Sequence, residues 1–251
     1  MDAGQLVDSF AEQVTQETTA ERARSDRTWT FGHVVVDEAQ ELSPMQWRLL
    51  VRRSPMRSFT IVGDIAQASS LEAPSSWDAA LDPFFAGRWQ VEELTVNYRT
   101  PTHIVLEAER VAREHGLSLT STRSVREGDW PIQEDLVAHA DRLPAAVVDA
   151  VRRDKSVSEA GTLAVITAAD SHAAVLSQLV DAFGGDVGTG ARGLDRPIAV
   201  LSAHDVKGLE FDSVVVADPD GLLAESRRGA AALYVAMTRP TQRLTMVKVA
   251  E

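Results

Sequence analysis

Short apolar runs alternate along the chain with stretches in which apolar residues recur every three or four positions. The apolar runs predict strands at 34–37, 59–62, 90–96, 163–167, 198–202, 214–217 and 244–249. The amphipathic stretches predict helices at 5–24, 104–115, 145–153, 173–183 and 230–238. Ser43-Pro44 is a good N-cap and first helical position for one more helix. Strands that alternate with helices predict an α/β fold with a mostly parallel sheet in each half of the chain.

Three segments lack either pattern, and a proline indicates where the two halves divide. Residues 71–83 favour a surface loop, 120–133 a hairpin or loop, and the glycine-rich stretch 184–193 a flexible segment. Pro101 disfavours a helical conformation at the residue before it. We therefore expect a first domain at 1–99 and a second at 100–251.

Composition limits the classes of function. The chain has 251 residues, 44% of them hydrophobic, and can bury a substantial core. It has no cysteine, which excludes disulfides and thiolate metal sites, and no two histidines stand at metal-ligand spacing. Residues 1–10 have neither the basic nor the apolar part of a signal peptide, and no apolar run approaches the roughly 18 residues of a membrane span. We expect a cytoplasmic protein without a membrane span or a zinc site.

The formal net charge of -12 bears on the choice of partner. Lys and Arg supply most of the affinity in sequence-independent binding to nucleic acid, so an acidic chain is poorly suited to it. We therefore expect any contact with single-stranded nucleic acid to use a local patch. An acidic surface equally suits a basic protein partner, or it simply keeps the chain soluble.

Two adjacent carboxylates end the first apolar run. Asp37 and Glu38 follow three valines, at the strand end where ligands bind in parallel α/β sheets. Asp37 could hold Mg²⁺, directly or through water, and Glu38 could polarise the water that attacks the γ-phosphate of a nucleotide. An isolated Asp-Glu pair is more often a solvated turn, so the preceding strand is what favours a nucleotide site.

Polar residues also follow the next two predicted strands. In Gly63-Asp64-Ile65-Ala66-Gln67, the Gln67 amide can donate to a phosphate oxygen and accept from water, as a γ-phosphate sensor would. In Asn97-Tyr98-Arg99-Thr100, Tyr98 could stack on a base and Arg99 could reach a phosphate. The alternatives are an ordinary strand-to-helix turn for the first segment and a partly buried tyrosine beside a surface arginine for the second.

Two further polar segments stand near the C-terminus. His204, Lys207 and Gly208 are candidates to contact a nucleic-acid phosphate, although a lone histidine is more often structural. Glu210 could accept hydrogen bonds from a ribose hydroxyl. Arg239 ends a predicted helix, where it could satisfy terminal carbonyls or act as an arginine finger.

No phosphate-binding loop accompanies these segments. The sequence contains no Gly-x-x-x-x-Gly-Lys-[Ser/Thr], and its three lysines, Lys155, Lys207 and Lys248, follow no such loop. The chain therefore has the features of part of a nucleotide motor without its own phosphate cradle.

Taken in order, the five segments resemble motifs of superfamily 1 helicases of the UvrD/Rep type. They read Asp-Glu-Ala-Gln, Gly-Asp-x-x-Gln, Asn-Tyr-Arg-[Ser/Thr], His-x-x-Lys-Gly-Leu-Glu-Phe-Asp and Leu-Tyr-Val-Ala-x-Thr-Arg, and they span roughly residues 33–249. The resemblance implies two RecA-like lobes that close on ATP and Mg²⁺, the first of them incomplete. It also implies roles for Asp37 and Glu38 at Mg²⁺ and water, Gln67 in phosphate sensing, Tyr98 in base stacking, Arg99 and Arg239 as arginine fingers, and Glu210 at the ribose.

The chain departs from typical members in ways that are similar to the HelD branch, ATPases that bind bacterial RNA polymerase. Between Arg99 and His204 there is too little sequence for the accessory insertion of DNA-unwinding members. The segment Leu42-Ser43-Pro44-Met45-Gln46-Trp47 and the acidic net charge also resemble that branch. We expect a HelD-like motor on RNA polymerase whose phosphate loop lies in a missing N-terminal segment, with little ATPase activity in this chain alone. The alternatives are a non-catalytic module that docks on RNA polymerase or a DNA-repair partner, and an unrelated α/β domain with chance matches.

Overall fold

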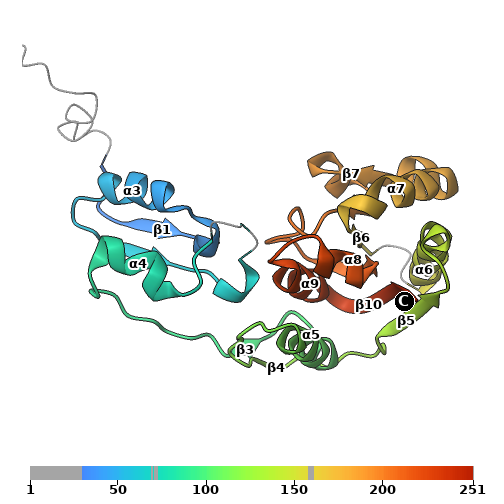
Figure 1. Ribbon diagram of the computed structural model, residues 1–251, viewed down its shortest axis with the longest axis horizontal. Coiled ribbons are helices and arrows are strands. Elements are labelled where there is room, and N and C mark those ends of the chain that lie inside the picture. Colours follow the sequence, from blue (N-terminus) through green and yellow to red (C-terminus); the bar gives the residue numbers. More distant parts are fainter. Residues whose placement is uncertain (1–29, 69, 71–72, 158–160, 251) are drawn as a thin grey trace, which may run out of the picture. The chain divides into compact units, whose positions relative to one another are not determined.

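The chain folds into two compact units (Figure 1). The computed structural model describes residues 30–68, 70, 73–157 and 161–250. The first unit takes its described residues from 1–63 and 75–89, and the second takes them from 64–74 and 90–251. The helix expected at 5–24 lies outside the described residues, and the domain limits expected from the sequence, 1–99 and 100–251, stay a prediction.

The first unit is built on two parallel strands. Its elements are β1 (Val34–Val36), η2 (Ala39–Glu41), α3 (Pro44–Arg53), β2 (Phe59–Ile61) and α4 (Trp77–Phe85). Trp47 of α3 is buried at the centre of its core, stacked on Phe84 and edge-on to Phe85. The predicted cap of α3 is confirmed, because the Ser43 side chain accepts from the N–H of Gln46 and the Gln46 side chain accepts from the N–H of Ser43.

The second unit is built on a parallel sheet of six strands in the order β5-β10-β9-β6-β8-β7, in which every adjacent pair is parallel. A separate parallel pair joins β3 to β4. The elements of the second unit are η3 (Ile65–Gln67), β3 (Val96–Asn97), α5 (Thr102–Glu114), β4 (Arg123–Ser124), β5 (Gln133–Val137), η4 (Ala140–Arg142), α6 (Leu143–Val157), β6 (Leu163–Thr167), α7 (Ala169–Phe183), η5 (Gly184–Asp186), β7 (Val187–Thr189), η6 (Ala191–Asp195), β8 (Ile198–Leu201), β9 (Phe211–Ala217), α8 (Pro219–Ala224), α9 (Gly229–Met237) and β10 (Pro240–Val249). The α/β fold with parallel sheets is therefore confirmed.

Helices cover both faces of the six-stranded sheet. On β6, Ala164 and Ile166 pack into a core with α5 and α9, whereas Leu163 and Val165 pack into a core with α6 and α7. Because both faces are covered, β6 is buried at every position, and its sequence is a continuous apolar run rather than an alternating one. None of the described helices is both long and apolar enough to cross a membrane.

Some predicted elements differ from the observed ones. The loop expected at 71–83 is wrong in its second half, where α4 begins after Ser76 and includes Pro83. The strand expected at 90–96 is reduced to Val96–Asn97. Strands β5 and β7 were not expected, because both are short edge strands that expose polar residues or contain glycine.

Candidate functional site

The acid pair Asp37 and Glu38 forms an exposed turn directly after β1 in the first unit. Glu38 has a left-handed backbone with φ of 49°, and its N–H donates to Asp37 Oδ1 over 2.8 Å. Gln40, only 1% exposed, donates from Nε2 to Glu38 Oε2 over 2.6 Å. These contacts hold two carboxylates at the surface in a fixed arrangement.

Gly63 allows the chain after β2 to lie close to this turn. A Cβ at Gly63 would lie 2.3 Å from Gln40 Oε1 and 3.1 Å from the backbone nitrogen of Ala39. The N–H of Ala39 also donates to the carbonyl of Val62 over 3.0 Å. The glycine of the Gly-Asp-x-x-Gln segment is therefore required by the space around the acid turn.

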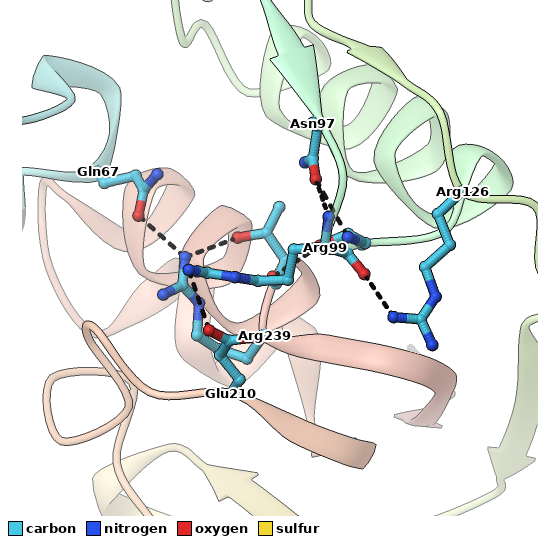
Figure 2. Close-up of polar contacts among 8 residues, drawn as sticks. Gln67, Asn97, Arg99, Arg126, Glu210 and Arg239 are labelled. Carbon is cyan, nitrogen blue, oxygen red and sulfur yellow. Dashed lines mark hydrogen bonds and ion pairs between the residues drawn. The ribbon is translucent and has the colours of Figure 1, made fainter. Parts of the chain in front are cut away.

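Gln67 and Arg239 meet in the second unit, although 172 positions separate them in the sequence (Figure 2). Arg239 Nη2 donates to Gln67 Oε1 over 3.0 Å, and Gln67 Nε2 donates to Asp64 Oδ2 over 2.9 Å. Asp64 also caps η3 by accepting from the N–H of Ala66. The Gln67 amide is thereby oriented with its oxygen toward a guanidinium and its nitrogen toward a carboxylate.

Arg239 satisfies a carbonyl of α9, which is one of the two roles that the sequence left open, and its role as an arginine finger stays a prediction. The side chain is only 4% exposed, and its Nε donates to the carbonyl of Val235 over 3.1 Å. Its Nη2 also contacts Thr238 Oγ1 over 3.2 Å. The guanidinium therefore satisfies a carbonyl near the end of α9 and at the same time presents Nη2 to Gln67.

Arg99 forms an ion pair with Glu210, in which Nη2 lies 3.0 Å from Oε1 and both side chains are partly exposed. Asn97 Oδ1 accepts from the N–H of Arg99 over 2.9 Å and from that of Thr100 over 3.1 Å. Tyr98 is 77% exposed, so the alternative of a partly buried tyrosine does not hold. The Asn97 side chain therefore fixes the backbone from which Arg99 and Tyr98 extend.

A buried hydrogen bond joins the two arginine segments. Thr100 Oγ1 donates to the carbonyl of Thr238 over 3.2 Å. Because Thr100 follows Arg99 and Thr238 precedes Arg239, the bond brings the two arginines onto neighbouring backbones (Figure 2). Four of the predicted site residues, Gln67, Arg99, Glu210 and Arg239, are thus assembled within the second unit.

His204, Lys207 and Gly208 lie on the turn between β8 and β9 that leads to Glu210. Asp205 Oδ2 closes this turn by accepting from the Ser202 N–H over 3.2 Å and from its hydroxyl over 2.7 Å. Gly208 has a left-handed φ of 70°, which favours glycine at this position. His204 is exposed and Lys207 is half-buried. The three residues share one ordered turn, and their contact with nucleic acid stays a prediction.

Sequence reasoning missed one residue that supports the assembled group and one that is buried near it. Asp64 orients Gln67, and its place three residues before Gln67 could have indicated this role. Tyr234 is buried on α9, and burial raises the pKa of its phenol to about 12, with a smaller contribution from the carboxylates of Asp64 and Glu109. The phenol of Tyr234 is therefore within the electrostatic influence of Asp64, the residue that orients Gln67.

The donors of the second unit suit a phosphate group. Arg99 binds a carboxylate oxygen and Arg239 binds an amide oxygen, and guanidinium groups bind phosphate oxygens in the same way. In the first unit, the Asp37 carboxylate suits Mg²⁺, which proteins hold through one or two carboxylates together with phosphate and water oxygens. Among the described residues, no three His, Asp or Glu residues form a group that could hold a metal ion. Asp37 therefore fits a Mg²⁺ ion that takes its other ligands from phosphate and water.

Comparisons with known proteins indicate a class for part of the chain. Residues 197–247 match the family model of the UvrD-like helicase C-terminal domain. The matched segment includes His204, Glu210 and Arg239 and runs from the residue before β8 into β10.

One similar solved structure is the C-terminal domain of a possible DNA helicase from Lactobacillus plantarum WCFS1. It is 24% identical in sequence with a TM-score of 0.48, and the match covers 61% of this chain and 88% of that one. No protein with a curated description matches the sequence.

Proposed function

We propose that the chain is the C-terminal part of an ATP-dependent UvrD-like helicase or translocase, and that its second unit reads the γ-phosphate of ATP. The observation that carries the proposal is the hydrogen bond between Arg239 and Gln67, since it joins two segments that the motif hypothesis assigns to one phosphate. The family match over residues 197–247 supports the same class.

In this proposal, the second unit holds the transferring phosphoryl group through guanidiniums. Bound ATP would supply the phosphoanhydride that water cleaves, and Mg²⁺ would neutralise charge on its phosphate oxygens. Arg99 and Arg239 would exchange their present acceptors, Glu210 and Gln67, for phosphate oxygens. Release of Glu210 from its ion pair frees its carboxylate for a ribose hydroxyl, so nucleotide binding and rearrangement of the pair are linked.

The remaining predicted roles belong to exposed residues. The Asp37 carboxylate would hold Mg²⁺, and the neighbouring Glu38 would accept a proton from the attacking water. The exposed ring of Tyr98 would stack on the base. Each role uses a side chain that is exposed in the structure.

The test is ATP hydrolysis by this chain joined to a segment that supplies a strand and a glycine-rich Lys-[Ser/Thr] loop. The chain alone should bind ATP weakly, and the joined protein should hydrolyse it. R239K keeps the charge but loses the planar fork, so kcat of the joined protein should fall by about 10³-fold or more, the usual loss for an arginine finger. R110K on α5 is the matched control, because Arg110 is exposed and pairs with Glu107 and Glu114 away from the cluster.

Two results would contradict the proposal. One is a folded joined protein that binds ATP and does not hydrolyse it, which would favour the non-catalytic interaction module. The other is an R239K variant with unchanged kcat, which would reduce Arg239 to a structural role at the end of α9.

We further propose that the motor acts on RNA polymerase, as in the HelD branch. The described residues between the start of α5 and the end of β8 belong to the second unit, which supports a lobe without the accessory insertion of DNA-unwinding members. The joined protein should co-elute with RNA polymerase core enzyme, and polymerase should stimulate its ATPase. If single-stranded DNA or RNA stimulates the ATPase and polymerase does not, the motor moves on nucleic acid instead, with His204, Lys207 and Gly208 as the contacts.

A further inference from the structure

A hollow of about 220 Å³ lies where α6 meets the start of β10 in the second unit. Trp130 and Val157 stand at its exposed rim, and Asp154, Arg243 and Thr245 are buried at its floor. Its lining residues include Gln133 of β5, Asp154 of α6 and Arg243 of β10, and these three elements lie side by side in Figure 1. It shares no residue with the candidate phosphate site.

The floor contains a buried guanidinium with an unused hydrogen-bond donor. Arg243 is only 7% exposed, and it forms no ion pair with the residues that the structure describes. Its Nη1 reaches the carbonyl of Asp154 over a long 3.4 Å, and its Nε has no hydrogen-bond partner among the same residues. A buried donor without an acceptor is costly, and a guanidinium binds a negatively charged acceptor most strongly, so the hollow favours an anionic ligand.

The neighbouring carboxyl selects the kind of anion. Asp154 is 5% exposed, and burial raises its pKa, although Arg243, Arg153 and a hydrogen bond from Thr245 oppose the shift and Asp135 adds to it. A raised pKa makes it easier for this carboxyl to take up a proton and donate it to a second carboxylate, and any negative charge left on it repels a doubly charged phosphate more strongly than a singly charged carboxylate. The floor therefore favours a singly charged carboxylate.

The residues at the rim indicate what kind of molecule carries this carboxylate. The Arg243 guanidinium carbon lies 3.7 Å from the centre of the Trp130 ring, so cation and ring are stacked. Trp130 and Val157 add exposed apolar surface beside the guanidinium. We propose that this hollow binds a small organic acid, with its single carboxylate at Arg243 and Asp154 and a flat apolar body against Trp130 and Val157.

Binding of benzoate, followed by ¹H–¹⁵N NMR of the full chain, tests the proposal. Benzoate should bind with a dissociation constant on the order of 1 mM, as expected for a small fragment, and should shift the indole signal of Trp130. Benzamide has nearly the same shape without the charge and should bind at least about tenfold more weakly. Inorganic phosphate should not compete.

Substitutions test separately how the charge of Arg243 and the shape of the rim contribute to benzoate binding. R243M should abolish benzoate binding, because it removes both the charge and the hydrogen-bond donors at the floor. R152M is the matched control on α6, since exposed Arg152 pairs with Asp149 and does not line the hollow. V157F narrows the rim while keeping the floor, so it should weaken binding even if R243M does not fold. Equal binding of benzoate and benzamide, or benzoate binding unchanged by both R243M and V157F, would overturn the proposal.

Discussion

At the scale of single residues, Tyr234 reports the charge of the candidate phosphate site. The chain has two tyrosines, so Y98F leaves Tyr234 as the only one. We expect this phenol to titrate with a pKa near 12, because burial and the Asp64 carboxylate favour its neutral form. D64N should lower that pKa without restoring the ordinary value, since burial is the larger cause. Ultraviolet titration of Y98F and Y98F/D64N measures both values. If D64N leaves the pKa of Tyr234 unchanged, the Asp64 carboxylate does not lie close enough to influence the phenol.

The same shift makes stability depend on alkaline pH. The folded pKa of Tyr234 lies above its ordinary value near 10, so the stabilisation is fully present below pH 10 and is lost as the pH rises toward 12. Y234F has no proton to release, and its free energy of unfolding should fall less between pH 9 and pH 11, by about 1–1.5 kcal/mol. Urea unfolding of the unmodified protein and of Y234F at about pH 9 and pH 11 tests this. Equal losses of unfolding free energy in the two proteins would exclude a raised pKa of Tyr234.

The sequence predicted which residues belong to the candidate site, but not which of them contact each other. The sequence indicated Gln67, Arg99, Glu210 and Arg239 as candidates, and the structure assembles them. It did not indicate that Arg99 pairs with Glu210 or that Arg239 binds Gln67, because these contacts depend on how α9 packs against η3 and how β9 is placed. Such pairings arise from tertiary packing, which local patterns do not encode.

At the scale of elements, the cap of α3 can be tested by itself. Ser43 and Gln46 satisfy each other's backbone N–H groups at the start of this helix. S43A leaves the N–H of Gln46 without this partner and should lower the free energy of unfolding by about 1 kcal/mol, whereas S43G should cost only a few tenths. Chemical denaturation followed by tryptophan fluorescence measures the difference. R48A, at an exposed position within the same helix, is the control and should have little effect; equal values for S43A and R48A would contradict the cap.

Buried elements were easier to predict than edge elements. The strands 163–167 and 198–201 are buried on both faces, so their sequences are unbroken apolar runs. The edge strand β5 instead carries charges that pair along the surface, Glu134 with Lys248 and Asp135 with Arg153, and its pattern is that of a loop. Helix α4 was missed because Pro83 is usually a helix breaker, whereas here it stands near the C-terminal end of a short helix.

At the scale of the whole molecule, the two units should differ in stability. The described core of the first unit rests on two strands of three residues and two helices, whereas the second has a six-stranded sheet with a core on each face. A two-stranded sheet with a small core is marginal by itself, so the first unit should unfold at a lower urea concentration.

The tryptophans allow the two transitions to be separated. W29F/W130F leaves Trp47, Trp77 and Trp89, all in the first unit, while far-UV circular dichroism is dominated by the second. The fluorescence midpoint should precede the dichroism midpoint, and coincident midpoints would mean one cooperative transition instead. If a loop-bearing segment completes the sheet of β1 and β2, as the proposed function requires, joining it should raise the first midpoint selectively, because added strands and helices bury the exposed Val35 and Val62.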